Sequence, residues 1–145
     1  MGKKRVIKKG EEGGEEGKAA GAKMGNRAGG RFVRGRVYVQ ATYNNTIITI
    51  TDDHGGALAW SSAGSLGFSG AKKATPFAAA RVVETLGEKI RRIGLQEISV
   101  FVSGVGSGRD SAVRALANQG LQILSIKDTT PIPHNGPRAR KVRRV

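Results

Sequence analysis

The chain has 145 residues, no cysteine and a formal net charge of +14 at pH 7. This length fits one ordinary domain, the lack of cysteine excludes disulfides and thiolate metal sites, and no apolar run is long enough to span a membrane. The basic N-terminus continues into Gly and Glu instead of an apolar segment, so we expect a protein that is not exported by a signal peptide. The cysteine-free composition is compatible with the reducing cytoplasm.

The positive charge is concentrated at the two ends of the chain. Residues 1–36 carry a net charge of +7, residues 131–145 carry +5 without an acid, and the segment between them carries only +2. Terminal segments of this composition bury too little apolar surface to fold alone, and an anionic partner would order them. Neither end has a clear apolar stripe or a lipidation signal, so nucleic acid is favoured over an acidic membrane surface.

The charge pattern also predicts the domain organisation. We expect a flexible Gly/Glu/Lys-rich basic extension over residues 1–35, a single α/β RNA-binding domain over 36–130 and an extended basic tail over 131–145. Within the first segment, the Glu-rich stretch would repel phosphate, and the arginines closest to the domain are the expected contacts. These are Arg27, Arg31 and Arg34, together with Arg36 at the start of the domain.

The domain opens with alternating apolar residues, which are typical of strands. Two β-branched runs flank a break at Asn44-Asn45, and this arrangement predicts a hairpin. A Gly-rich turn at 53–56 and a further run at 57–61 extend it to an antiparallel meander of three strands. The alternation places four residues of the first strand on one face, namely Val37, Val39, Ala41 and Tyr43.

A glycine-rich loop and a helix follow the meander. Residues 61–73 include Gly67, Gly70, Lys72 and Lys73, which offer an approachable backbone and positive charge. The same loop contains one large aromatic residue, Phe68, which either packs into the core, the commoner case, or stacks on a base. Thr75-Pro76 then begins a helix that Gly94 ends, with apolar residues at helical spacing between them.

The central signal is a strand, a glycine turn and a second helix. An apolar run ends at Val102, Gly104, Gly106 and Gly108 follow, and helical spacing then continues to Gly120. Glycines allow close approach of an anion, and the first amides of a helix carry partial positive charge, so this turn together with Arg109 predicts a phosphate-binding site.

A last strand over residues 121–126 completes the predicted α/β fold. The strand, helix and strand in so few residues imply a parallel crossover. The fold class is therefore a mixed sheet, formed by an antiparallel meander and then α-β-α-β, with two main helices. The tail beyond it contains three prolines and cannot join a sheet interior, so its cations are held extended.

Two enzyme interpretations compete with RNA binding. The glycine turn precedes a helix and Asp128 lies 20 residues beyond Gly108, as in dinucleotide-binding folds, but the glycine spacing differs and the turn comes late in the chain. Asp52, Asp53 and His54 could in principle hold a metal for a ribonuclease-H-like nuclease. Three consecutive residues on a tight turn converge poorly, so a polar turn with local backbone bonds is favoured.

Four sequence blocks resemble a known family. They are ATYNNTIITITD from Ala41, GFSGAKKATPFAA from Gly67, GVGSGRDS from Gly104 and TPIPHNG from Thr130. In this order, the blocks are similar to the S-eleven family of small-subunit ribosomal proteins, of bacterial type, over the chain from about Arg36 to Val145. The family often has proline at positions 105 and 107, where this chain has Val and Ser.

The resemblance implies a ribonuclease-H-like sheet topology and no catalytic activity. It also implies a place on the platform of the small subunit, where such a protein binds small-subunit rRNA near the mRNA exit side and contacts neighbouring platform proteins. No metal, cofactor, small-molecule substrate or membrane is expected. The expected RNA-binding residues are Arg31, Arg34, Arg36, Asn44, Asn45, Gly67, Phe68, Gly70, Lys72, Lys73, Gly104, Gly106, Gly108, Arg109, His134, Asn135, Arg138, Arg140, Lys141, Arg143 and Arg144.

Overall fold

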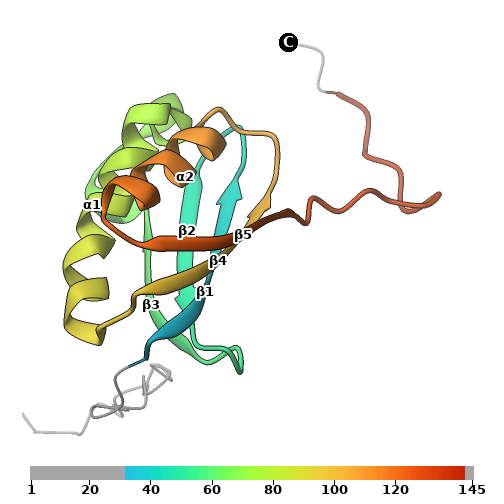
Figure 1. Ribbon diagram of the computed structural model, residues 1–145. Coiled ribbons are helices and arrows are strands. Elements are labelled where there is room, and N and C mark those ends of the chain that lie inside the picture. Colours follow the sequence, from blue (N-terminus) through green and yellow to red (C-terminus); the bar gives the residue numbers. More distant parts are fainter. Residues whose placement is uncertain (1–31, 143–145) are drawn as a thin grey trace, which may run out of the picture.

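The computed structural model describes residues 32–142, and these form a β-sheet with two main helices on one side of it (Figure 1). The elements in chain order are β1 (Arg34–Ala41), β2 (Thr46–Thr51), β3 (Ala57–Ser62), the short 3-10 helices η1 (Gly64–Leu66) and η2 (Gly70–Ala74), α1 (Pro76–Ile93), β4 (Glu97–Ser103), α2 (Gly108–Asn118) and β5 (Gln122–Asp128). Within this part of the chain, no helix is long and apolar enough to cross a bilayer.

The sheet has five strands in the order β3-β2-β1-β4-β5. Strand β2 pairs antiparallel with both β1 and β3, while β4 pairs parallel with both β1 and β5. This arrangement confirms the predicted mixed sheet, with the meander on one half and the strand-helix-strand crossover on the other. Strand β1 lies at the centre, so its two ends are the places where the halves of the fold meet.

The first strand differs from its predicted bounds. It begins at Arg34 and ends at Ala41, so Tyr43 lies outside the strand and is 76% exposed instead of sharing the face of Val37. The cause is the tight connection to β2. The Thr42 hydroxyl accepts a hydrogen bond from the Asn45 N–H at 3.0 Å and the Thr42 N–H donates to the Asn45 carbonyl at 2.9 Å, which ends the extended backbone before Tyr43.

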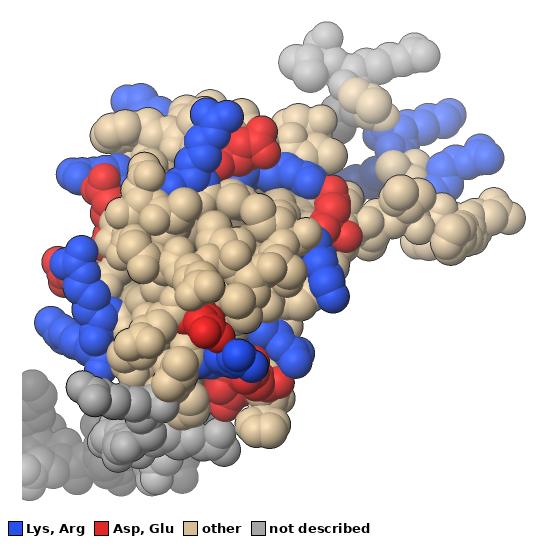
Figure 2. All heavy atoms as spheres, in the orientation of Figure 1, with Lys and Arg blue, Asp and Glu red and all other residues tan. Residues whose placement is uncertain are grey.

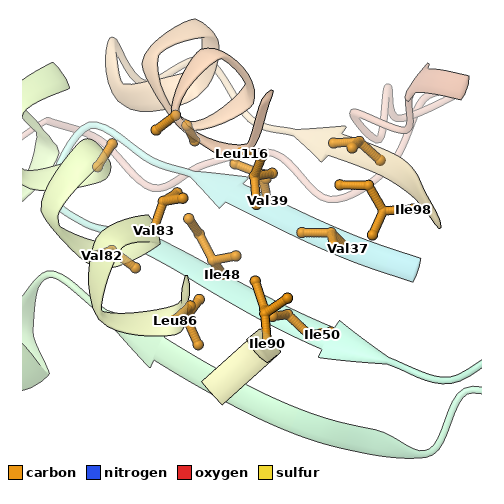
Figure 3. Close-up of a cluster of buried hydrophobic side chains, with 14 of the residues drawn as sticks. Val37, Val39, Ile48, Ile50, Val82, Val83, Leu86, Ile90, Ile98 and Leu116 are labelled. Atoms are coloured by element: carbon orange, nitrogen blue, oxygen red, sulfur yellow. The ribbon is translucent and has the colours of Figure 1, made fainter. Parts of the chain in front are cut away.

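The core lies between the sheet and the two helices (Figure 3). Because side chains of a strand alternate between its two faces, every second residue of the central strands points to the helices. Helix α1 contributes a stripe at helical spacing, and α2 contributes Leu116. The side chains that meet in this core include Val37, Val39, Ile48, Ile50, Val82, Val83, Leu86, Ile90 and Ile98.

Helix α1 begins and ends where the sequence predicted. The Thr75 hydroxyl accepts a hydrogen bond from the Ala78 N–H, Pro76 occupies the first helical position and Gly94 ends the helix. Gly87, which is unfavourable inside a helix, is buried beside the Gln119 side chain at the end of α2. The absence of a side chain at position 87 therefore allows the two helices to pack closely.

The position of Leu86 predicts a large effect of truncating its side chain. Leu86 is fully buried, so Leu86→Ala should lower the free energy of unfolding by about 2–5 kcal/mol, measured by urea denaturation. Leu124 on β5 is 49% exposed and serves as the matched control, and Leu124→Ala should cost about 1 kcal/mol or less. Equal losses for the two variants would contradict the placement of the core.

Candidate nucleic-acid interface

Three connections meet at one end of the sheet, where β1 and β4 finish. These are residues 42–45, 64–74 and 104–107, which we call the loop end. The Gly106 N–H donates to the Ala41 carbonyl at 2.9 Å, and the Ser107 hydroxyl donates to the Ala74 carbonyl at 2.8 Å. The structure thus brings together predicted contact residues that are widely separated in the sequence, namely Asn44, Asn45, Gly67, Gly70, Lys72, Lys73, Gly104 and Gly106.

The structure gives a reason for the three glycines of this turn that the sequence did not reveal. Gly104 has φ +95°, and a Cβ added there would overlap the carbonyl oxygen of Ala41. A Cβ at Gly106 would overlap the Thr42 carbonyl oxygen, and one at Gly108 would lie 2.7 Å from the Thr46 hydroxyl oxygen. These glycines therefore let the turn pack against the end of β1. Their contact with an RNA phosphate stays a prediction.

This packing occupies the place where an α/β sheet usually binds a nucleotide. Strand order reverses between β1 and β4, since the chain adds β2 and β3 on one side and β5 on the other. Ligands of open α/β sheets bind in the crevice at such a switch point, beyond the carboxyl ends of the strands. Here, Gly104 and Gly106 bring the turn directly onto Ala41 and Thr42. Because the turn fills this crevice, the structure weakens the nucleotide-binding alternative that the sequence left open.

Arg109 holds the start of the tail to the glycine turn. Its guanidinium donates to the Gly104 carbonyl at 2.8 Å and forms an ion pair with the Asp128 carboxylate at the end of β5. The Thr130 hydroxyl donates to that carboxylate at 2.6 Å and accepts a hydrogen bond from the Gly104 N–H at 3.2 Å. The charge predicted for a phosphate site thus already has a partner within the chain.

The Asp128 carboxylate is the acid that the dinucleotide interpretation required. The Thr130 hydroxyl and then the Arg109 guanidinium stabilise its charged form, and they hold the pKa of Asp128 well below its usual range. Both groups contact the carboxylate from the chain itself. This partnership explains the position of Asp128 without a ribose.

The second loop of the loop end leaves its backbone and charge accessible. Gly67 and Gly70 are exposed and have no atom within 4 Å of an added Cβ, in contrast to Gly104. Lys72 on η2 is exposed and Lys73 is half-buried. This loop therefore retains the open backbone that was predicted for RNA contact, and its two lysines form no ion pair within residues 32–142.

The environment of Phe68 fits packing into the core, which was the commoner of the two alternatives given for its ring. Its ring is partly buried against the hydrophobic core and meets the Phe77 ring edge-on, with centroids 6.1 Å apart. This environment favours packing over base stacking. On the neighbouring connection, Asn44 is exposed, whereas the buried side-chain oxygen of Asn45 has no hydrogen-bond partner among residues 32–142.

The remaining predicted cations lie away from the loop end. Residues 131–142 are all exposed and contain no helix or strand, and Figure 1 shows them leading away from the domain. Blue spheres mark their basic side chains in Figure 2, and the tail residues predicted to bind RNA here are His134, Asn135, Arg138, Arg140 and Lys141. Arg34 and Arg36 belong to the start of β1, at the opposite end of the sheet, and Arg34 pairs with Glu97 at 2.6 Å. Arg31, Arg143 and Arg144 lie outside the described residues.

The acidic turn between β2 and β3 is a structural turn. The Asp52 carboxylate accepts hydrogen bonds from the His54 N–H at 2.9 Å and the Gly56 N–H at 2.6 Å, as the favoured interpretation predicted. In residues 32–142, no three His, Cys, Asp or Glu side chains are placed to hold a metal ion. Strand β1, where a ribonuclease-H-like nuclease needs a carboxylate, contains neither Asp nor Glu.

Sequence reasoning missed the sheet face that points away from the helices. Tyr38, Phe101 and Trp60 lie on that face, together with Lys127. The signal was present in the alternation of each strand, because residues between buried positions must point outward. Only the strand order, which the sequence left open, places these residues next to one another.

Together, these features define a small basic α/β protein with exposed glycine backbone and exposed cations. The family described as ribosomal protein S11 matches residues 35–144. The chain therefore belongs to the S11 family of ribosomal proteins, which are proteins of the small subunit. This result confirms the family that the four sequence blocks indicated.

Relatives from three bacteria share the family name small ribosomal subunit protein uS11. The chain is 60% identical to the protein of Treponema pallidum over 111 residues, which cover 77% of this chain and 88% of the relative. It is 57% identical to the protein of Solibacter usitatus, with 77% of this chain and 82% of that protein covered. For Borreliella burgdorferi, the identity is 53%, with 77% and 85% covered.

The packing of the glycine turn predicts the effect of a methyl group at position 104. Gly104→Ala should lower the free energy of unfolding by roughly 3 kcal/mol or more, because left-handed backbone strain adds to the overlap with Ala41. Gly55→Ala is the matched control, since Gly55 has φ +88° and open space around it, and it should cost only roughly 1–2 kcal/mol. If urea denaturation gave the same loss for both, the turn would not depend on close packing.

The lowered pKa of Asp128 predicts a pH-dependent contribution to stability. Because the folded protein binds this proton less readily than the unfolded chain, the contribution is present above the usual Asp pKa of about 3.9 and is lost as pH falls through the lower, folded value. At pH 7, Asp128→Asn should therefore unfold at lower urea than the wild type, and the difference should shrink below about pH 4.

The exposed Asp53 on the β2–β3 turn provides the control for this prediction. Asp53→Asn should leave the urea midpoint at pH 7 close to that of the wild type. A wild-type midpoint for Asp128→Asn at pH 7 would show that the Arg109 contact does not stabilise the fold.

Proposed function

We propose that the protein is a structural constituent of the small ribosomal subunit that binds small-subunit rRNA and stabilises its tertiary fold without catalysing a reaction. In this proposal it lies on the platform near the mRNA exit side, beside other platform proteins, in cytoplasmic ribosomes. Membership of the S11 family supports the class of function. The distribution of unpaired positive charge supports the mode of binding, in which exposed cations contact RNA phosphates.

The observation that carries the proposal is the exposed positive charge of the tail, which has no carboxylate partner among residues 32–142. The domain, by comparison, holds both paired and unpaired cations. Arg34, Arg81 and Arg109 each have a carboxylate partner within the domain. Arg138, Arg140 and Lys141 are exposed on a segment without regular structure, and none forms an ion pair within residues 32–142. Cations held in this way are available for phosphates, and each contact would release bound counterions.

The loop end would provide the contact surface of the folded domain. Gly67 and Gly70 leave the backbone approachable, and Lys72 extends beside them. Phosphates of a folded RNA can contact such backbone amides and cations without reading the base sequence. The tail begins at the same end of the sheet, because Thr130 is bonded to Gly104. Loop and tail could therefore bind adjacent parts of one RNA.

The strand order supports the ribonuclease-H-like topology that the family resemblance implied, with an antiparallel meander followed by two parallel strands. A nuclease of that topology needs several converging carboxylates. Strand β1 has none, and the Asp52 carboxylate is bonded to the amides of its own turn. The arrangement supports use of this topology as a scaffold for binding.

The tail contribution can be measured from the salt dependence of binding. Replacement of Arg138, Arg140 and Lys141 by Gln should weaken binding to a small-subunit rRNA transcript. It should also reduce the log–log salt slope by about 2–3, because each phosphate that the chain neutralises adds roughly 0.7–0.9 to that slope. Filter binding over a range of KCl concentrations would measure both quantities.

The control is a second triple variant, which removes three positive charges from the helices instead of the tail. Arg91, Arg92 and Arg114 are exposed on α1 and α2, and their replacement by Gln should leave the slope nearly unchanged. If the tail variant retained the wild-type slope, or if both triple variants reduced it equally, specific use of the tail would be disproved.

A further inference from the structure

The sheet has one face without a covering layer in residues 32–142. Both main helices lie on the other face (Figure 1). The strand register aligns Trp60 with Thr49, Thr49 with Tyr38, Tyr38 with Phe101 and Phe101 with Lys127. Residues aligned in this way point to the same face. These five residues, which we call the cross-strand row, therefore follow one line across all five strands.

The aromatic rings of the cross-strand row differ in whether they contact another ring. Tyr38 and Phe101 stack on each other with centroids 5.1 Å apart and planes 17° apart, and the Lys127 ammonium lies 6.0 Å from the centre of the Phe101 ring. These two rings therefore already have partners along the row. Trp60 is 52% exposed at the edge strand and makes no ring contact with another aromatic residue in the described part of the chain.

The charges on this face are suited to phosphate. Arg36 is aligned with Ser99 on the same side as Tyr38, and it makes no ion pair within residues 32–142. Glu97 is the acid that alternation places on this face, and it is paired with Arg34. The net unpaired charge is therefore positive, from Arg36 and Lys127. Thr49, Ser99 and Ser125 add hydroxyl groups to the same face. With this charge and these hydroxyls, the face is complementary to a sugar-phosphate chain more than to an apolar protein surface.

We propose that this open sheet face is a second RNA-binding surface, which takes an unpaired segment of RNA with one base stacked on Trp60 and phosphates beside Arg36 and Lys127. This inference rests on the proposed function in rRNA binding, but it adds a site on a different surface from the loop end and the tail. Four strand spacings separate Trp60 from Lys127, about 19 Å across the sheet. That span fits several nucleotides of an extended strand.

The segment must be unpaired because an indole ring can stack only on an accessible base face. Bases within an RNA duplex are stacked on each other, whereas those of loops and bulges can be splayed onto a protein aromatic residue. Stacking of this kind tolerates any base, since each base has a π face. The site would thus recognise the single-stranded state of the RNA more than its sequence.

The protein contains a single tryptophan, so its fluorescence reports directly on this site. A short unpaired oligoribonucleotide of mixed sequence should quench Trp60 emission and protect it from acrylamide, whereas a fully paired duplex should leave it accessible. The full chain bound to a small-subunit rRNA transcript should show the same protection. Continued acrylamide access to Trp60 in the saturated rRNA complex would overturn the inference and would leave this face for a neighbouring protein.

Affinity measurements with the same rRNA transcript provide a second test. Trp60→Leu should weaken binding about 5- to 100-fold, the loss expected for one base stack. Trp60→Phe is the matched control, because a phenyl ring at the same position can still stack on a base, and it should retain most of the wild-type affinity. Likewise, the Arg36→Gln, Lys127→Gln double variant should reduce the salt slope by about 1.4–1.8, whereas Arg114→Gln should not.

The outcomes separate this inference from the function on which it rests. If Trp60→Leu bound like the wild type while the tail variant bound weakly, the sheet site would be wrong and the rRNA-binding function would stand. If the wild-type chain did not bind the transcript at all, both would fail. Far-UV circular dichroism of each variant shows that a loss of binding is not a loss of folding.

Discussion

The architecture depends on one close backbone contact, the packing of the 104–107 turn onto the carboxyl end of β1. Gly104 and Gly106 allow it, and the bond from the Gly106 N–H to the Ala41 carbonyl fixes it. This contact joins the antiparallel meander to the parallel half of the sheet at the point where strand order reverses. It also fills the crevice that would bind a nucleotide in a related enzyme fold. This end of the sheet is therefore closely packed.

The same end of the sheet holds an ion pair that positions the start of the tail. Arg109 and Asp128 are used to attach the start of the tail, so the chain leaves the sheet in a defined place. Between Thr130 and Val142, the basic residues are exposed, while several cations of the domain have carboxylate partners. Some of the positive charge thus positions segments of the chain, and the exposed cations of the tail stay accessible to a polyanion.

Local signals in the sequence were sufficient for most elements of the fold. Alternation, the Thr75-Pro76 helix start and Gly94 predicted strands and helices within a few residues of their observed bounds. Long-range partners could not be predicted in the same way. Nothing local shows that Arg109 meets Asp128, or that the glycines face the backbone of β1. The sheet face was missed for the same reason, because alternation identifies two faces but not the neighbours on either.

We infer that a nearly neutral domain with exposed cations on its surface and tail binds rRNA and does not react with it. The most direct measurement is binding of the full chain to a small-subunit rRNA transcript over a range of salt concentrations with Mg²⁺, with the length of the RNA examined in the same samples. The affinity should fall linearly with salt on a log–log scale, with a slope of several units, and the transcript should stay intact. Affinity that does not depend on salt, or cleavage of the RNA by the pure protein, would contradict this inference.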